Sequence, residues 1–228
     1  MTLRLGLLSA LLAACATPGL RAPPSDERGF EPPPPLLSLP LAAPAGPRTR
    51  IVRRADSYVG LASLAGVSRG VPDDCTGLAR LAYAGADLLG HEARLGDDGV
   101  TAMYRHARAL GALHRTPPRP GDLVFFRDTT SRGAPDDGAL THVGVVVSVD
   151  ENGTIAFVHR TNEGVRKARM TLREPHRHAG PNGAVLNDYL RRRSAERGAR
   201  LTGELFAGFA SADRLAPNKP AAVATRGE

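Results

Sequence analysis

The spacing of apolar residues changes once along the chain, and this change constrains the fold more than any other feature. Apolar side chains recur at helical spacing over residues 51–65, 76–89 and 100–113. Farther along, a short apolar run covers 123–126, β-branched runs cover 143–149 and 155–158, and residues 164–172 alternate as in a strand. Helices followed by strands predict an α+β domain, with N-terminal helices packed on an antiparallel sheet.

A turn signal separates two of the predicted strands. Asn152 and Gly153 lie between the runs 143–149 and 155–158, and this dipeptide favours a tight hairpin with positive φ. The two strands therefore run antiparallel. His142 at the start of one and His159 at the end of the other are expected at the same edge of the sheet, offset rather than directly opposed.

The N-terminus is typical of an exported protein. Residues 1–14 contain an early arginine, an apolar run and small residues, as in a secretory signal peptide. The run is too short for a membrane-spanning helix. Residues 12–15, Leu-Ala-Ala-Cys, resemble a bacterial lipobox, which implies cleavage before Cys15 and lipid attachment to its sulfur. The resemblance implies a lipoprotein, in the outer membrane facing the periplasm if the host has two membranes. The alternative is an ordinary signal peptide that contains a cysteine.

Composition separates a central domain from its flanks. Residues 15–48 are rich in proline and lack periodicity, which predicts a tether. Residues 215–228 are predicted to be a disordered tail. The folded domain is expected at 49–214, long enough for one core. The net charge of +7 could suit nucleic acid, but an exported lipoprotein meets anionic cell-wall polymers and lipid head groups instead, so no nucleic-acid partner is expected. Charge alone does not choose between these partners, and a basic surface is more often only solvated.

Cys75, one of the two cysteines in the chain, lies in the stretch PDDCTGLARLAY. If Cys15 carries lipid, Cys75 has no disulfide partner, which calls for a chemical reason. Asp74 is a good N-cap, so Cys75 is expected in the first turn of a helix, where the dipole lowers a thiol pKa. These features favour a nucleophile. The alternative is a small buried hydrophobic residue.

Histidine supplies the candidate base. Of seven histidines, His142 and His159 stand at strand ends, which suits a base and the partner that orients it. If His159 does not orient the base, Asn162, three residues farther on, is the next candidate for that role. Taken alone, both histidines are equally compatible with satisfied or exposed positions at strand ends.

Three ordered blocks resemble the NlpC/P60 family of cell-wall peptidases. They are DDCTGLARLAY, RPGDLVFF and THVGVVVSVDENGTIAFVHR, within residues 51–172. The resemblance implies a papain-like NlpC/P60 fold with Cys75 as nucleophile, His142 as base and acid, and His159 as orienter. Gly121 and Asp122 match a turn and are expected to serve structure.

The sequence departs from the family pattern ahead of the nucleophile. Ala62 and Ser63 stand where many members carry Pro and Tyr, which leaves the substrate contacts on that side open. Thr76 replaces the usual serine and keeps the hydroxyl. Candidate substrate-binding residues are Ser63, Asp136 and Asp137, the two aspartates being alternatively solvated loop residues.

No metal or other cofactor is expected. His176 and His178 lack nearby cysteine or carboxylate ligands at metal-site spacing. Three other histidines in or between the helical segments are expected at the surface: His91, His106 and His114.

These features predict a lipid-anchored cysteine peptidase that hydrolyses an amide bond in peptidoglycan stem peptides. The resemblance implies the bond between D-glutamate and the diamino acid. One alternative is a catalytically silent wall-binding or scaffold lipoprotein of the same fold. Another is an amidase or acyltransferase that acts on another bond.

Overall fold

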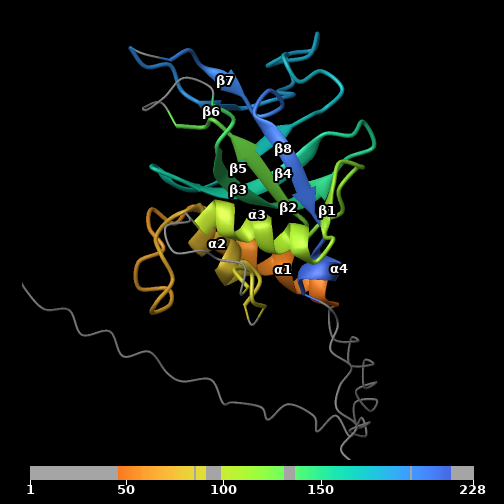
Figure 1. The fold of residues 1–228 in the computed structure, drawn as a ribbon. Helices are drawn as coiled ribbons and strands as arrows, with labels where there is room; N and C mark the ends of the chain where they lie inside the picture. Colours follow the sequence, from red (N-terminus) through yellow and green to blue (C-terminus); the bar gives the residue numbers. More distant parts are fainter. Residues whose placement is uncertain (1–45, 85, 91–98, 131–136, 196, 217–228) are drawn as a thin grey trace, which may run out of the picture. The chain divides into compact units, whose positions relative to one another are not determined.

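An antiparallel sheet with helices on one face is the centre of the structure, a computed structural model that describes residues 46–84, 86–90, 99–130, 137–195 and 197–216 (Figure 1). The helices are α1 (Pro47–Ser57), α2 (Cys75–Ala82), α3 (Gly99–Ala109) and α4 (Ala212–Leu215). The strands are β1 (Leu113–His114), β2 (Leu123–Arg127), β3 (Leu140–Val149), β4 (Ile155–Thr161), β5 (Gly164–Met170), β6 (Tyr189–Arg191), β7 (Arg200–Leu201) and β8 (Phe206–Ala210).

Six of these strands form the main sheet, in the order β1-β8-β2-β3-β4-β5, and every neighbouring pair is antiparallel. The remaining two, β6 and β7, pair separately. The predicted α+β class is confirmed, and the architecture is consistent with a papain-like fold.

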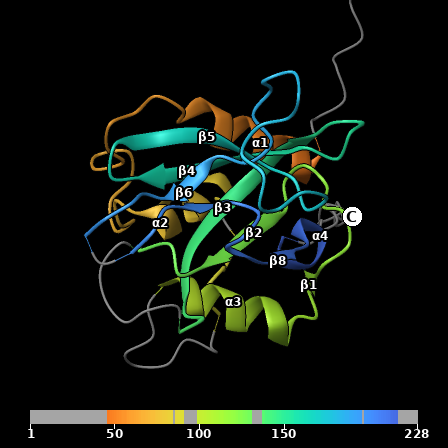
Figure 2. The same ribbon diagram turned by 90° about the horizontal axis from the view of Figure 1, so that it is seen from above.

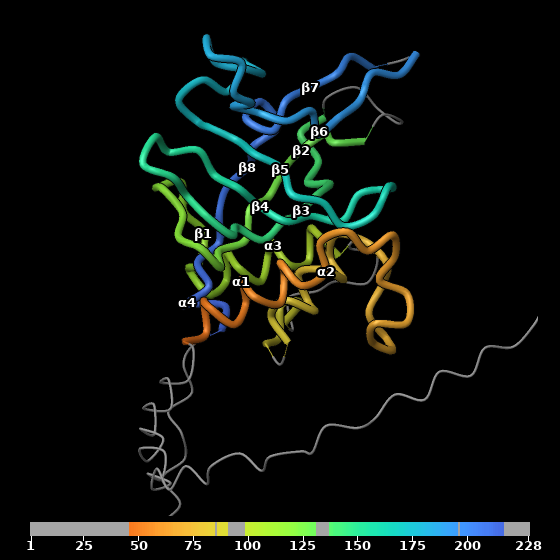
Figure 3. The backbone as a smooth tube through the Cα atoms, turned by 180° about the vertical axis from the view of Figure 1, so that it is seen from behind, coloured from red at the N-terminus to blue at the C-terminus, as the bar shows by residue number. Residues whose placement is uncertain are grey.

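The sheet is covered on both faces. Helices α1, α2 and α3 pack on one face, while β6, β7 and their connections lie over the other, as views from opposite sides show (Figures 1 and 3). Leu78 of α2 and Val145 of β3 belong to the core on the helical side, and Phe126 and Phe157 belong to the core on the opposite side. Burial on both faces explains why β2 reads as a continuous apolar run.

The three long helices end earlier than their apolar spacing predicts. After α1, the backbone at residues 60–61 hydrogen-bonds to Val165 of β5, so the predicted helix 51–65 stops at Ser57. After α3, Gly111 takes a positive φ of 61°, and the N–H of Ala112 donates to the carbonyl of Ala107, which closes the helix. The predicted helix 76–89 likewise ends at Ala82.

The predicted hairpin joins β3 and β4, and its Gly153 has a positive φ of 80° as expected. The N–H of Gly153 donates to the carbonyl of Asp150. The loop therefore consists of a turn followed by one left-handed glycine. A register shift between Val146 and Ser148 then adds one residue to β3.

Both ends of the described chain add elements that the sequence analysis did not predict. Helix α1 begins at Pro47, inside the predicted tether, and α4 extends to Leu215. Strand β8 enters the sheet between β1 and β2. The predictions for residues 1–45, which include Cys15, and for 217–228 lie outside the described residues. Among the helices that the structure describes, none is long and apolar enough to cross a membrane.

Candidate active site

Cys75 is the first residue of α2, as predicted. The side chain of Asp74 accepts hydrogen bonds from the N–H groups of Thr76 and Gly77, which confirms the predicted N-cap. The Thr76 hydroxyl also donates to Asp74, at 2.7 Å. The Asp74 carboxylate therefore accepts its hydrogen bonds from the start of the helix, and Cys75 lies half-buried beside it.

The thiol of Cys75 lies beside the beginning of the histidine strand, because α2 packs on β3. The backbone N–H groups of Val143, Cys75 and Thr76 are near enough to lower the pKa of the thiol. Val143 directly follows His142 in β3. Helix α2 and strand β3 thus bring the thiol to the residue next to the predicted base.

His142 and His159 contact each other, as predicted. Nε2 of His142 lies 2.9 Å from Nδ1 of His159, and the rings meet edge to face. Val145 pairs with Val158, so continuing that register places Gly144 opposite His159 and His142 two residues away on the same face. A Cβ at Gly144 would lie only 2.7 Å from the ring of Phe157, so glycine is required for this close packing.

The short contact is compatible with a pair of tautomers that suits a base. If Nε2 of His142 carries the proton and donates to His159, Nδ1 of His142 has a free lone pair. Burial lowers the pKa of His159 well below its usual value, and the neighbouring His142 lowers it further, so His159 stays neutral and able to accept. Burial also lowers the pKa of His142 to about 4, although part of its ring opens to solvent.

The structure contradicts the expected acidity of the thiol. Burial raises the pKa of Cys75 to about 11, and the nearby Asp74 carboxylate raises it further, against the three backbone N–H groups that lower it. Desolvation of the thiolate therefore outweighs the helix N-terminus. In this structure Cys75 is a neutral thiol beside neutral histidines.

One cleft of about 890 Å³ contains all three residues. Asn162, the alternative third residue, also lines it, but His159 is the residue that contacts His142. Ser63 does not line the cleft, but its hydroxyl donates to Asp73, which does, at 2.7 Å. Asp137 does not line it either and accepts from the N–H of Ala139, while Asp136 lies outside the described residues.

The turn before β2 is structural, as expected. Gly121 has a φ of 95°, and the buried carboxylate of Asp122 accepts from Arg48, from the N–H of Arg119 and from the N–H of Ala212. These bonds join α1, the turn and α4. The prediction of purely local bonds for Asp122 is therefore too narrow.

The remaining histidines do not form a metal site in the described part of the chain. No group of three or more His, Cys, Asp or Glu side chains gathers there in a way that would hold an ion. His106 and His114 are half-buried instead of exposed as predicted, since Gly90 lies against the ring of His106 and Phe209 of β8 packs with the ring of His114. His91 lies outside the described residues.

Two groups near the site were not identified from the sequence. Arg160, directly after His159, pairs with Asp73 at 2.9 Å and lines the cleft. Tyr189 and Arg192 enter the cleft from the connection between β5 and β8. The dipeptide HR offered a weak signal for Arg160, whereas nothing local related Tyr189 to residues more than a hundred positions away.

A comparison with protein families supports the interpretation. The family model of the CHAP domain matches residues 66–161, which contain α2, β2, β3 and β4. No curated protein matches the chain. Cys75, His142 and His159 all fall inside the matched segment. Residues 66–161 thus match the CHAP domain, a cysteine- or amidase-type peptidoglycan hydrolase domain related to NlpC/P60.

Proposed function

We propose that the chain is a lipid-anchored cysteine peptidase that hydrolyses the amide bond between D-glutamate and the diamino acid of peptidoglycan stem peptides. The observation that carries this proposal is the arrangement of three groups in one cleft. The His142 ring contacts His159 at 2.9 Å, and Cys75 lines the same cleft, with the backbone N–H of Val143, the residue after His142, near enough to lower the pKa of its thiol.

The proposed first step starts from neutral groups. Nδ1 of His142 takes the proton from Sγ of Cys75 as the sulfur attacks the substrate carbonyl carbon, because a free thiolate is scarce when the thiol pKa is about 11. The carbonyl oxygen becomes an oxyanion. The backbone N–H of Cys75 at the start of α2 is a donor for that charge.

The proposed second step uses the imidazolium that His142 becomes when it takes the thiol proton. His142 returns its proton to the leaving amine, the C–N bond breaks, and a thioester to Cys75 remains. Water, deprotonated by His142, then attacks the thioester and releases the acid product with the thiol. His159 accepts the Nε2–H of His142 throughout and so keeps the ring oriented.

The proposed location rests on the N-terminal sequence. Residues 1–14 as a signal peptide, lipid on Cys15 and the proline-rich segment that follows would hold the domain at a membrane within reach of the wall. With two membranes, we propose the outer one, facing the periplasm.

Two alternatives have specific support. The raised thiol pKa favours a silent wall-binding or scaffold lipoprotein, because a reactive cysteine usually has a lowered pKa. The CHAP match favours an amidase or acyltransferase at another bond as much as an endopeptidase.

One experiment separates these functions. The full chain and its Cys75→Ser variant are incubated with purified muropeptides, and the products are identified by mass spectrometry. We expect cleavage between D-glutamate and the diamino acid by the unmodified chain alone. Cleavage at the sugar–peptide amide identifies an amidase. If neither the unmodified chain nor the Cys75→Ser variant cleaves any muropeptide, the result supports the silent lipoprotein.

A further inference from the structure

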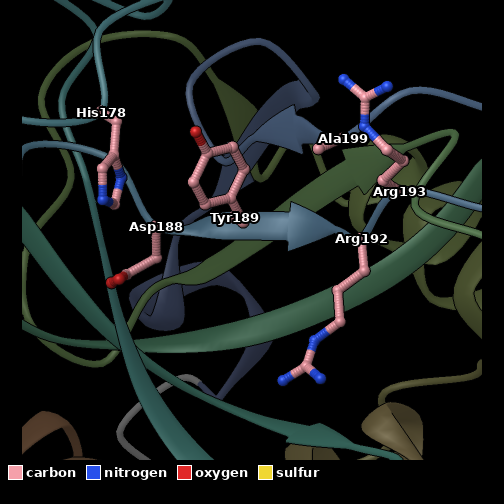
Figure 4. Close-up of a pocket in the computed structure, with 6 residues that line it drawn as sticks. All are labelled: His178, Asp188, Tyr189, Arg192, Arg193 and Ala199. Atoms are coloured by element: carbon pink, nitrogen blue, oxygen red, sulfur yellow. The ribbon is translucent and has the colours of Figure 1, made fainter.

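A second cavity adjoins the catalytic cleft on the side of β6. It has a volume of about 420 Å³ and is lined by His178, Asp188, Tyr189, Arg192, Arg193 and Ala199 (Figure 4). Three of these residues, Asp188, Tyr189 and Arg192, also line the cleft that contains Cys75. A ligand that extends along the cleft away from Cys75 would therefore reach this cavity.

The cavity belongs to the layer that covers the sheet opposite the helices. Seen from above, β6 crosses over the sheet (Figure 2). This layer lies beyond residues 66–161, the segment that the CHAP family model matches. The features of the second cavity are thus additional to the matched domain.

Tyr189 presents a rigid aromatic surface in the cavity. The residue is 55% exposed, although it stacks on the ring of His178 with centroids 4.8 Å apart. His178 is itself held, because its Nδ1 lies 2.7 Å from the carbonyl oxygen of Asn187. Asn187 is fully buried and bonds to the backbone of Thr171, Glu174 and Arg177. Because His178 and Asn187 already hold the ring of Tyr189 in place, ligand binding costs little further conformational entropy there.

The polar groups around Tyr189 include both donors and an acceptor. Arg192 and Arg193 extend from opposite sides of the chain after β6 (Figure 4). Arg192 pairs with Glu163 at 2.7 Å across the cleft, whereas Arg193 has no hydrogen bond or ion pair with any residue in the described ranges. Asp188 accepts from the N–H of Arg169 through one carboxylate oxygen, Oδ2.

This combination fits a sugar better than a simple anion. A carboxylate beside the arginines would repel an anionic ligand, whereas hydroxyl and amide groups use donors and acceptors together. The flat face of an aromatic ring packs against the apolar C–H face of a sugar ring while its hydroxyl stays hydrated. The volume is that of a small-molecule site and exceeds the space that one amino-acid side chain needs.

We infer that Tyr189, with Arg193 and Asp188 beside it, forms a saccharide subsite that binds the N-acetylated glycan to which the stem peptides are attached. This inference rests on the proposed function for the identity of the substrate. The stem peptide occupies the cleft at Cys75, and its glycan extends over β6.

Binding measured without catalysis tests the subsite. The full chain carrying Cys75→Ser is titrated by calorimetry with soluble glycan strands from which the stem peptides have been removed. Adding Tyr189→Ala is expected to weaken binding by about 3- to 10-fold, the range of one aromatic contact. Tyr189→Phe keeps the ring and is expected to bind within about twofold of the parent.

Two control variants, at exposed positions elsewhere on the surface, match Tyr189→Ala and the corresponding change Arg193→Ala. Leu110→Ala removes an apolar side chain that is 39% exposed at the end of α3, and Arg214→Ala removes an exposed arginine in α4. Neither is expected to change binding. Circular dichroism of each variant verifies that the fold is retained.

Several outcomes would overturn the inference. These are no binding of stripped glycan by the parent, equal binding by Tyr189→Ala, or binding that requires the stem peptides. A loss shared by the two control variants, or one that follows Arg193→Ala but not Tyr189→Ala, contradicts a stacking site as well. Failure of the proposed function is seen separately, as absent muropeptide cleavage by the chain with Cys75 intact.

Discussion

The carboxylate of Asp73 and the guanidinium of Arg160 form a two-point ion pair, with Nε–Oδ1 at 2.9 Å and Nη2–Oδ2 at 3.0 Å. Asp73 stands two residues before Cys75, and Arg160 directly follows His159. The pair therefore ties the start of α2 to the end of β4. Arg160, the N–H of Leu64 and the hydroxyl of Ser63 hold the pKa of Asp73 well below its usual value.

We expect this ion pair to position the two halves of the site. Asp73→Asn and Arg160→Gln should each lower kcat by about tenfold, because a misplaced reacting group slows attack more than it weakens binding. The double variant should be no slower than the worse single variant, since both remove one interaction. Arg177→Gln, which breaks an exposed pair with Glu174, is the control. Additive losses in the cycle would show that the two residues act separately.

The two histidines should differ in their effect on rate. His142→Ala should be worst, with a loss of at least about 10² to 10⁴, because the residue moves a proton in both steps. His159→Ala should be intermediate. His159→Asn should be mildest, since its amide oxygen also accepts the Nε2–H of His142. Single-turnover rates on one muropeptide give the ranking, and wild-type turnover by His159→Ala would move the third role to Asn162.

Activity should persist to unusually low pH. His142 accepts a proton only when it is neutral, so kcat/KM should fall as the pH drops through the lowered pKa of His142, about 4, and not through 6.5. The measurement is kcat/KM on one muropeptide from pH 3 to 8, with stability checked at each pH. An acidic limb centred near 6.5 would mean that the ring is solvated in the working enzyme.

Alkylation of Cys75 should be slow at neutral pH. With a thiol pKa raised to about 11 by burial, the rate with iodoacetamide should keep rising above pH 9, because only the thiolate reacts. Mass spectrometry of the peptide that contains Cys75 measures the rate. A rate that is already maximal at pH 7 would reveal a thiolate–imidazolium pair.

Membrane attachment should depend on Cys15. Cys15→Ala should move the protein from the membrane to the soluble fraction and leave muropeptide cleavage by the released protein unchanged, because the predicted lipid site and Cys75 are separate in sequence. Fractionation followed by immunoblotting gives the distribution. Retention of the variant in the membrane would indicate another mode of attachment.

Local sequence determined the elements that carry the site. The N-cap Asp74 and the apolar spacing after it place Cys75 at a helix start, and the β-branched runs around Gly153 produce the hairpin with His142 and His159. Such features depend on neighbours in the chain, so they can be read without tertiary structure. The helix ends could not be predicted as well, because the backbone at residues 60–61 bonds to Val165, a residue far along the chain.

Tertiary structure decided the chemistry of the groups that these elements bring together. The helix start favours a thiolate at Cys75, but burial against β3 raises its pKa, and desolvation depends on what surrounds a group in space. The pairing of Asp73 with Arg160 likewise joins residues 87 positions apart, and Tyr189 enters a cleft that is also lined by Cys75, which lies far before it in the chain. The spacing of residues in the sequence reveals the period of a helix or strand. Burial and long-range contacts arise only when the helices and the β6–β7 layer pack on the main sheet.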